Sequence, residues 1–179
     1  MKALENIKVL DLTRALAGPY CTLMLGDYGA DVIKVEVPSK GDDTRTWGPP
    51  FIKDQSSYFL SINRNKRSIT LNLKNQAAKD IFMKLVSESD VLVENFTPGV
   101  AQRLGIDYET LKELNPGIIY CSISGFGQTG PYSRKPAYDQ MMQGIGGIMS
   151  VTGEPDGPPM KMGVALTDIG AGMLGAYAV

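Results

Sequence analysis

The sequence contains no histidine. This absence removes the side chain most often used for proton transfer near neutral pH and the commonest metal ligand. The chain holds only two cysteines, Cys21 and Cys121, and they lie far apart in the sequence. That spacing fits neither a zinc knuckle nor a disulfide framework, so we expect two buried thiols and no metal site.

Net charge and long apolar runs are also lacking. Eighteen basic and nineteen acidic residues leave a formal charge of −1, so no electrostatic field favours nucleic acid or an anionic membrane as partner. No apolar run approaches the roughly 18 to 20 residues that span a bilayer, and the N-terminus shows no long apolar leader. We therefore expect a cytoplasmic protein that binds a small molecule.

What the chain does contain is a series of short, β-branched apolar segments. With 179 residues, of which 43% are hydrophobic, the chain is long enough to bury one domain core. Strands with two buried faces are typical of a parallel sheet. The segments predict strands at residues 7–12, 30–35, 68–73, 90–93 and 118–124.

Helical patterns separate these strands. Residues 75–88 repeat apolar side chains at helical spacing. Thr97 before Pro98 predicts a helix start, Gly105 a helix end, and Asp107 a second helix start. Helices alternating with strands predict an α/β fold with an open, doubly wound, Rossmann-like and mostly parallel sheet, with ligands near the carboxyl ends of its strands.

The segment Gly125-Phe-Gly-Gln-Thr-Gly130 matches the dinucleotide-binding pattern G-x-G-x-x-G. In a true fingerprint a helix begins within the motif, so that its N-terminus meets the pyrophosphate. Here Pro131 and Pro136 follow and oppose a helix. We predict a mobile loop that approaches a ligand, and a dinucleotide-dependent oxidoreductase is a distant alternative.

Charged and polar residues at strand ends suggest ligand contacts. Arg14 follows the first predicted strand and Lys74 the third, where they suit phosphates or carboxylates, whereas most other basic residues, Lys34 and Lys66 among them, are expected at the solvated surface. Asn95 and Phe96 follow the fourth strand. An amide and an aromatic ring at that edge suit adenine or an amide-bearing ligand.

Asp168 stands in an apolar, glycine-rich run from Gly163 to Gly172. Ionised side chains are rare in such apolar runs unless they have a structural or functional role. Asp168 is predicted to be the N-cap of the helix that follows or a carboxylate nucleophile, and the two roles do not exclude each other.

Six segments in order resemble the class III CoA-transferases, the family of formyl-CoA transferase and carnitine CoA-transferase. The resemblance runs from Ile7 to Val179, and it is nearest to members that use succinyl-CoA and a dicarboxylate. It rests on the following segments: Leu12-Thr-Arg-Ala-Leu-Ala-Gly-Pro19, Gly29-Ala-Asp-Val-Ile-Lys-Val-Glu36, Asn63-Arg-Asn-Lys-Arg-Ser68, Asn95-Phe-Thr-Pro-Gly99, Gly125-Phe-Gly-Gln-Thr-Gly-Pro131, and the run that holds Asp168.

The resemblance implies a catalytic role for Asp168, which would form an aspartyl-acyl anhydride and then an aspartyl-CoA thioester. Coenzyme A (CoA) and its acyl thioester would be substrates, with a small carboxylic acid as acceptor and no permanently bound cofactor or metal. The implied CoA contacts are Leu16, Ala17, Leu71, Asn72, Leu73, Lys74, Asn95, Phe96, Arg103, Tyr138 and Asp139. Arg14 or Arg45 would pair with the distal carboxylate of the acceptor.

The same fold is expected to host acyl-CoA racemases, which use a histidine in the segment that here reads Tyr138-Asp139. The missing histidine argues against racemisation. The sequence also departs from the transferase pattern: Val37 stands where an arginine is expected, and the lysine expected near Pro136 is displaced to Lys135.

Family members are considerably longer, with a second small domain and interlocked dimers. The resemblance thus implies that residues 1–179 are the N-terminal part of the large domain and that the full-length protein is a homodimer. The alternative from another functional class is a catalytically incompetent fragment that binds CoA or serves assembly.

Overall fold

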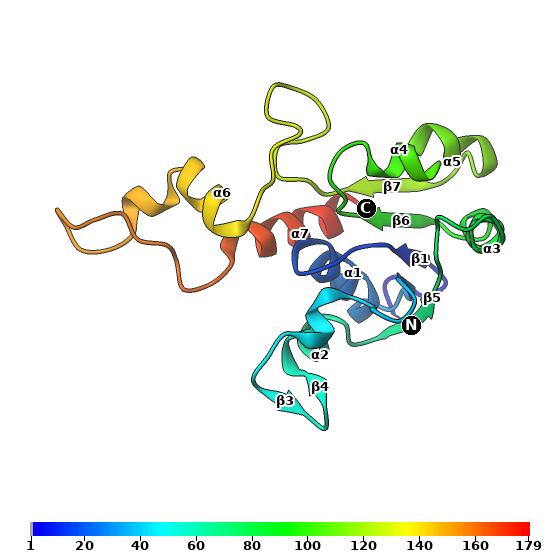
Figure 1. Cartoon of the computed structure of the whole chain (residues 1–179), viewed down its shortest axis with the longest axis horizontal. Coiled ribbons are helices and arrows are strands. Elements are labelled where there is room, and N and C mark those ends of the chain that lie inside the picture. The colour runs from blue at the N-terminus through cyan, green and yellow to red at the C-terminus, as the bar shows by residue number, and fades with distance from the viewer. Residues whose placement is uncertain (1) are drawn as a thin grey trace.

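The computed structural model describes residues 2–179 and has a five-stranded parallel sheet at its centre (Figure 1). The strand order is β5-β2-β1-β6-β7. The strands are β1 (Lys8–Asp11), β2 (Asp31–Glu36), β5 (Lys66–Thr70), β6 (Val91–Glu94) and β7 (Ile119–Ser122). All five predicted strands and the α/β fold class are confirmed; β5 begins and ends slightly earlier than its apolar pattern indicates.

Helices connect the strands. They are α1 (Ala17–Asp27), α2 (Ser57–Ile62), α3 (Gln76–Ser87), α4 (Val100–Leu104), α5 (Tyr108–Leu114), α6 (Asp139–Ile145) and α7 (Leu166–Ala178). Two 3₁₀ turns, Asp43–Thr46 and Ile148–Val151, and a small antiparallel hairpin, β3 (Phe51–Ile52) with β4 (Gln55–Ser56), complete the fold.

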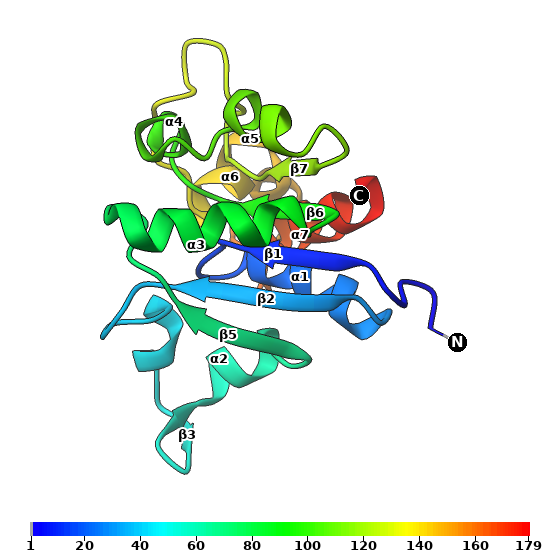
Figure 2. The ribbon, with the colours of Figure 1, turned by 90° about the vertical axis from the view of Figure 1, so that its right-hand side faces the viewer.

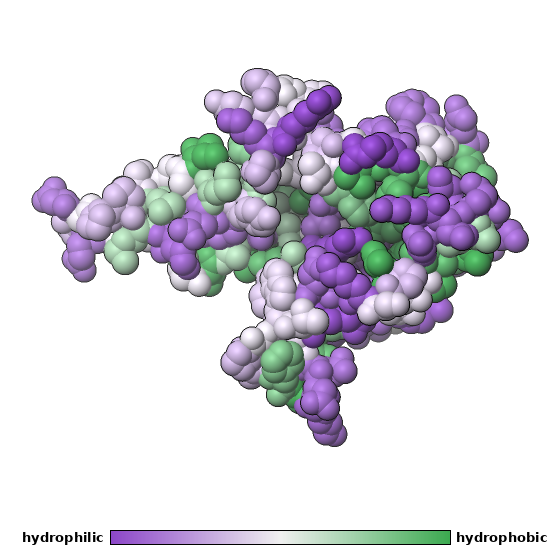
Figure 3. Space-filling model, viewed as in Figure 1, coloured by the Kyte–Doolittle hydropathy of each residue, from purple (hydrophilic) through white to green (hydrophobic). Residues whose placement is uncertain are grey.

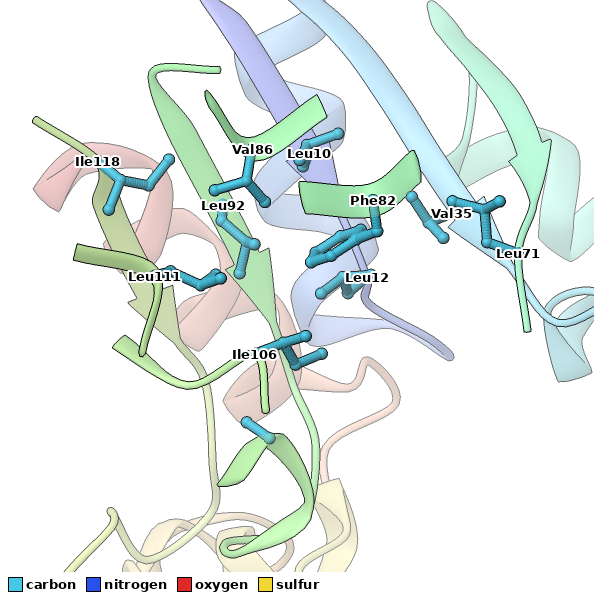
Figure 4. Close-up of a cluster of buried hydrophobic side chains, with 11 residues drawn as sticks. Leu10, Leu12, Val35, Leu71, Phe82, Val86, Leu92, Ile106, Leu111 and Ile118 are labelled. Atoms are coloured by element: carbon cyan, nitrogen blue, oxygen red, sulfur yellow. The ribbon is translucent and has the colours of Figure 1, made fainter. Parts of the chain in front are cut away.

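Two apolar layers cover the sheet. On one face, α3 lies along β6 and β1, and Phe82 packs with Leu10, Leu92, Ile106 and other buried side chains (Figures 2 and 4). The opposite face carries α1 and α7, and its buried cluster includes Cys21, Val9 and Val93. The doubly wound arrangement follows from these two layers, because each sheet face is covered by helices.

The two cysteines come together in the second layer. Cys21 is buried and Cys121 is partly buried, and both are free thiols. A methyl group at Gly175 of α7 would lie 3.3 Å from the Cys21 sulfur and 3.5 Å from the Cys121 sulfur. Their separation in the sequence gives no sign of this proximity.

Most predicted helix boundaries are confirmed. The Asp107 carboxylate accepts the Thr110 N–H at the start of α5, and Gly105 ends α4 at a φ of 66°. The predicted helix start at Thr97 is wrong. Gly99, at a φ of 88°, precedes α4, while the Thr97 backbone carbonyl accepts the Val100 N–H within a turn.

The chain between β7 and α7 extends away from the sheet (Figure 1). No helix or strand begins between residues 125 and 136, so the glycine motif lacks the helix that a dinucleotide fingerprint requires. Ile145, Val151 and Val164 are 62%, 86% and 55% exposed along this extension. The space-filling view shows apolar side chains among polar ones there (Figure 3).

Lys34 and Lys66 lie in the interior, which corrects the expectation that they are solvated. Their ammonium groups lie 2.9 Å from the Asp42 carboxylate and 3.0 Å from the Asp11 carboxylate, respectively. Burial raises the pKa of Asp11, but Lys66 and Lys34 outweigh it and hold that pKa at about 2. Lys34 also donates to the Thr13 carbonyl at 2.7 Å, so the cluster fixes the loop after β1.

Candidate active site

The carboxyl ends of the five parallel strands lie along one edge of the sheet. The chain leaves β1 for β2 on one side and later crosses to β6 on the other. In open α/β sheets the crevice at this switch point is the usual ligand site. The loop from Leu12 to Leu16 and the pair Asn95-Phe96 meet there.

Asn95 joins the two loops at the switch point. Its side-chain oxygen accepts the Arg14 N–H at 2.9 Å, and its amide nitrogen donates to the Arg14 carbonyl at 2.8 Å. This reciprocal pair differs from the expectation that the amide is free for a ligand. It holds the loop in which Ala15 adopts a φ of 63°, a strained backbone conformation for a residue other than glycine.

The segment from Leu71 to Lys74 follows β5 at the same edge. Leu71 is buried in the apolar core and Leu73 packs against it, so these side chains serve the core. The Asn72 side chain accepts the Lys74 N–H at 3.2 Å. Lys74 is exposed and is therefore the charged group that this segment offers to a ligand.

A cleft of about 870 Å³ lies between α4 and the glycine-motif loop. Phe96, Arg103 and Arg134 contribute to its lining. So do Glu94 and Tyr120, whose burial raises the pKa of both groups. The Tyr120 hydroxyl is buried and has no hydrogen-bond partner within residues 2–179.

Asp168 is the third residue of α7, and Ala165 occupies the N-cap position. The interpretation of Asp168 as the cap is therefore wrong. Asp139, the first residue of α6, accepts the backbone N–H groups of Thr167 at 2.9 Å and Asp168 at 3.4 Å. No hydrogen-bond donor within residues 2–179 reaches the Asp168 carboxylate oxygens.

The pKa of Asp168 is raised above its ordinary value, first by burial and then by the negative charge of Asp139. The start of a helix, in contrast, favours an ionised carboxylate. A carboxylate that is partly withdrawn from water and free of donors keeps its oxygen lone pairs available. Such a group is suited to nucleophilic attack on a carbonyl carbon.

The sequence did not predict Tyr58, which lies near Asp168, or Trp47, which packs against Tyr58. Burial raises the pKa of Tyr58, and the nearby negative charge of Asp168 raises it further. Trp47 packs edge-on against Tyr58 with ring centroids 5.2 Å apart. Both residues come from the segment between β2 and β5.

Helix α7 also contacts the start of α1. Gly172 lies one turn after Asp168, and a methyl group there would lie 2.5 Å from the Ala17 carbonyl oxygen. Helix packing thus brings Asp168 towards the segment Leu16-Ala17. Tyr138, the residue before α6, is 72% exposed.

Arg45 is not the free arginine that the sequence suggests. Its guanidinium donates to both Glu36 carboxylate oxygens at 2.7 and 2.6 Å and lies 3.8 Å from the Phe59 ring centre. Arg14 is exposed at the switch point. Within residues 2–179, no three histidine, cysteine or acidic side chains are grouped to hold a metal, and no helix is long and apolar enough to cross a membrane.

These observations define the class: an α/β protein with an open, doubly wound sheet and, near its switch point, a partly buried carboxylate that no donor within residues 2–179 reaches. Residues 4–179 match the model of CoA-transferase family III, and the chain belongs to this family.

Curated relatives agree with this assignment. The chain is 50% identical over 179 residues to human succinyl-CoA:glutarate CoA-transferase, covering 100% of this chain and 41% of that protein. It is 50% identical over 182 residues to succinate–glutarate CoA-transferase of Agrobacterium fabrum, covering 98% and 46%. A CAIB/BAIF family protein from Brucella suis superposes with a TM-score of 0.95 at 51% identity, covering 99% and 48%. The chain thus spans about half the length of the relatives it matches.

Proposed function

We propose that this chain supplies the nucleophile and part of the CoA site of an acyl-CoA:carboxylate CoA-transferase. The observation that carries the proposal is the Asp168 carboxylate, partly buried at the start of α7 with no hydrogen-bond donor in the described part of the chain. The similarity to succinyl-CoA:glutarate and succinate–glutarate CoA-transferases supports succinyl-CoA as donor and a dicarboxylic acid as acceptor.

In the proposed reaction, an Asp168 oxygen attacks the thioester carbonyl, the C–S bond breaks, and CoA leaves as thiolate. The thiolate then attacks the aspartyl carbonyl and expels the donor acid, which leaves an aspartyl-CoA thioester. The acceptor carboxylate attacks this thioester, which releases the CoA thiolate and forms a new anhydride between Asp168 and the acceptor. The thiolate then attacks the acceptor carbonyl of this anhydride and forms the product thioester. Asp168 is regenerated, and no net proton transfer is needed.

The CoA molecule is proposed to lie along the carboxyl edge of the sheet. Lys74 and Arg103 are exposed cations there, suited to the phosphates, and Phe96 offers an apolar surface. The backbones of Leu16-Ala17 and of residues 71–73 are proposed to line its path, together with Tyr138, which directly precedes Asp139, the acceptor of the Asp168 N–H. Arg14 is the proposed partner of the distal carboxylate of the acceptor.

We further infer that residues 1–179 form the N-terminal part of the large domain and that the complete protein is a homodimer. The first inference is supported by the length of the relatives. The second rests on the motif resemblance alone. An incompetent CoA-binding fragment and an acyl-CoA racemase are the alternatives. The same experiment separates them from the transferase.

The test uses the complete natural polypeptide that contains these residues. We expect it to transfer CoA from succinyl-CoA to glutarate, and hydroxylamine to trap a hydroxamate at Asp168, identified by peptide mass spectrometry. Asp168→Asn is expected to abolish both. Asp80→Asn, a substitution on the exposed surface of α3, is the matched control and is expected to leave both intact.

Undiminished transfer by Asp168→Asn would refute the mechanism. CoA binding without transfer by the unsubstituted protein would favour a catalytically incompetent CoA-binding role. Exchange of the α-proton of a branched acyl-CoA in deuterated water, with no transfer, would favour the racemase.

A further inference from the structure

Helix α7 receives its cap from another helix. Its own N-cap residue, Ala165, has no side chain that accepts a hydrogen bond. The first backbone N–H groups of a helix lack partners within the helix, and Ser, Thr, Asp or Asn at the N-cap usually satisfies one of them. In this chain the acceptor is Asp139 on α6, far upstream in the sequence.

We propose that Asp139 is a positioning residue for Asp168, holding the first turn of α7 so that the Asp168 carboxylate projects free of donors beside a second negative charge. This inference rests on the proposed function of Asp168. It gives Asp139 a role that differs from the CoA contact implied by the family resemblance.

The contacts of Asp139 are concentrated on the turn that carries Asp168. One carboxylate oxygen accepts the Thr167 N–H at 2.9 Å, the Thr167 hydroxyl at 2.7 Å and the Asp168 N–H at 3.4 Å. These bonds lower the pKa of Asp139, although burial acts to raise it. Asp139 therefore stays ionised while its charge lies next to the nucleophile.

The second oxygen of Asp139 is fixed by Gln143. The Gln143 amide donates to it at 2.6 Å and to the Val164 carbonyl at 3.1 Å. The Gln143 oxygen accepts the Met162 N–H at 2.8 Å, and the whole side chain is buried. Gln143 thus joins α6 to the segment that leads into α7, and the Asp139 carboxylate has one orientation.

This arrangement has two chemical consequences. The backbone N–H groups at the start of α7 bond to Asp139, so they are not available to the Asp168 carboxylate, whose lone pairs remain free for attack. The neighbouring negative charge also disfavours the ionised form of Asp168, and a more basic carboxylate is a stronger nucleophile. Tyr58 on α2 also lies within reach of this charge: burial raises the pKa of Tyr58, and the negative charge of Asp168 raises it further.

The test compares two substitutions in the complete natural polypeptide. Asp139→Ala removes both the cap and the charge, and kcat for transfer from succinyl-CoA is expected to fall about 10- to 100-fold with little change in KM, as for a misplaced catalytic group. Asp139→Asn keeps an oxygen that can accept the Thr167 N–H but removes the charge. It is expected to recover most of kcat and to move the acidic limb of the kcat–pH profile to lower pH.

The matched control is Asp90→Asn. Asp90 also accepts a backbone N–H, from Lys8 at 2.8 Å, but it lies at the opposite edge of the sheet. This variant is expected to leave kcat and its pH profile unchanged, which separates a general loss of stability from a loss of positioning.

Three results would overturn the inference: an Asp139→Ala enzyme with unchanged kcat, an increase in KM for succinyl-CoA with unchanged kcat, or an Asp139→Asn profile identical to that of the unsubstituted enzyme. The second of these would identify Asp139 as a CoA contact. If Asp139→Ala does not fold, the Asp139→Asn pH profile alone decides. Full activity of Asp168→Asn would instead refute the proposed function, independently of these outcomes.

Discussion

Replacement by alanine at Gly170 and at Gly172, both in α7, is expected to change the free energy of unfolding in opposite directions. A methyl group at Gly172 would lie 2.5 Å from the Ala17 carbonyl oxygen and 3.2 Å from the Cys21 backbone nitrogen, whereas ordinary contacts begin near 3.4 Å. A methyl group at Gly170 meets no atom within 4 Å. Both positions are helical, so alanine gains about 1 kcal/mol of helix propensity at each.

At Gly172 this gain is outweighed. The obstructing atoms belong to the α1 backbone and cannot rotate away, so the cost lies towards the upper end of the 1–3 kcal/mol typical of overpacked cores. Gly172→Ala is therefore expected to lower the free energy of unfolding by about 2 kcal/mol, and Gly170→Ala to raise it by up to about 1 kcal/mol. The difference between the variants, about 3 kcal/mol, exceeds the error of denaturant titrations.

The assay is urea denaturation of the complete polypeptide, followed by circular dichroism, with the two variants measured in parallel. Gly172→Ala is also expected to reduce transferase activity, because separation of α7 from α1 displaces Asp168 relative to Leu16-Ala17. A shift of the same sign and size in both variants would refute the close packing of α7 on α1.

Three further predictions concern other parts of the molecule. Burial raises the pKa of Glu36, but hydrogen bonds from Arg45 and its neighbours outweigh this and lower it to about 2. The contribution of Glu36 to stability is therefore complete above the ordinary glutamate pKa and is lost as the pH falls towards 2, so Glu36→Gln should flatten the acid-denaturation profile; an unchanged profile would contradict this. Lys34→Met is expected to lower the free energy of unfolding by about 3–5 kcal/mol, because it leaves buried carboxylates uncompensated, and a neutral result in urea denaturation would contradict the buried cluster. Arg103→Ala is expected to weaken CoA binding about tenfold in isothermal titration without changing stability, and unaltered affinity would exclude Arg103 as a phosphate contact.

The strands were predictable because a buried parallel strand needs apolar, β-branched residues on both faces, and the segment ending at Val93 shows this directly. Helix ends marked by a local residue were predictable too, as with Asp107 and Gly105. Thr97 misled because Gly99 supplies the positive φ that the turn before α4 requires. Lys34 is a cation within an apolar strand, and this pattern could have indicated that it is buried. Its acidic partners, Asp11 and Asp42, come from other segments and could not be identified from the sequence.

The sequence by itself determined the fold class, the family and the identity of the proposed nucleophile, since these depend on local periodicity and on motifs read in order. The tertiary structure decided which carboxylate caps α7, that Arg45 is paired with Glu36 whereas Arg14 is exposed, and that Tyr58 lies near Asp168. These relations join residues far apart in the chain, such as Asp139 with Thr167 and Asn95 with Arg14. Their hydrogen bonds and charges exist only after the helices have packed on the sheet, so no local pattern records them.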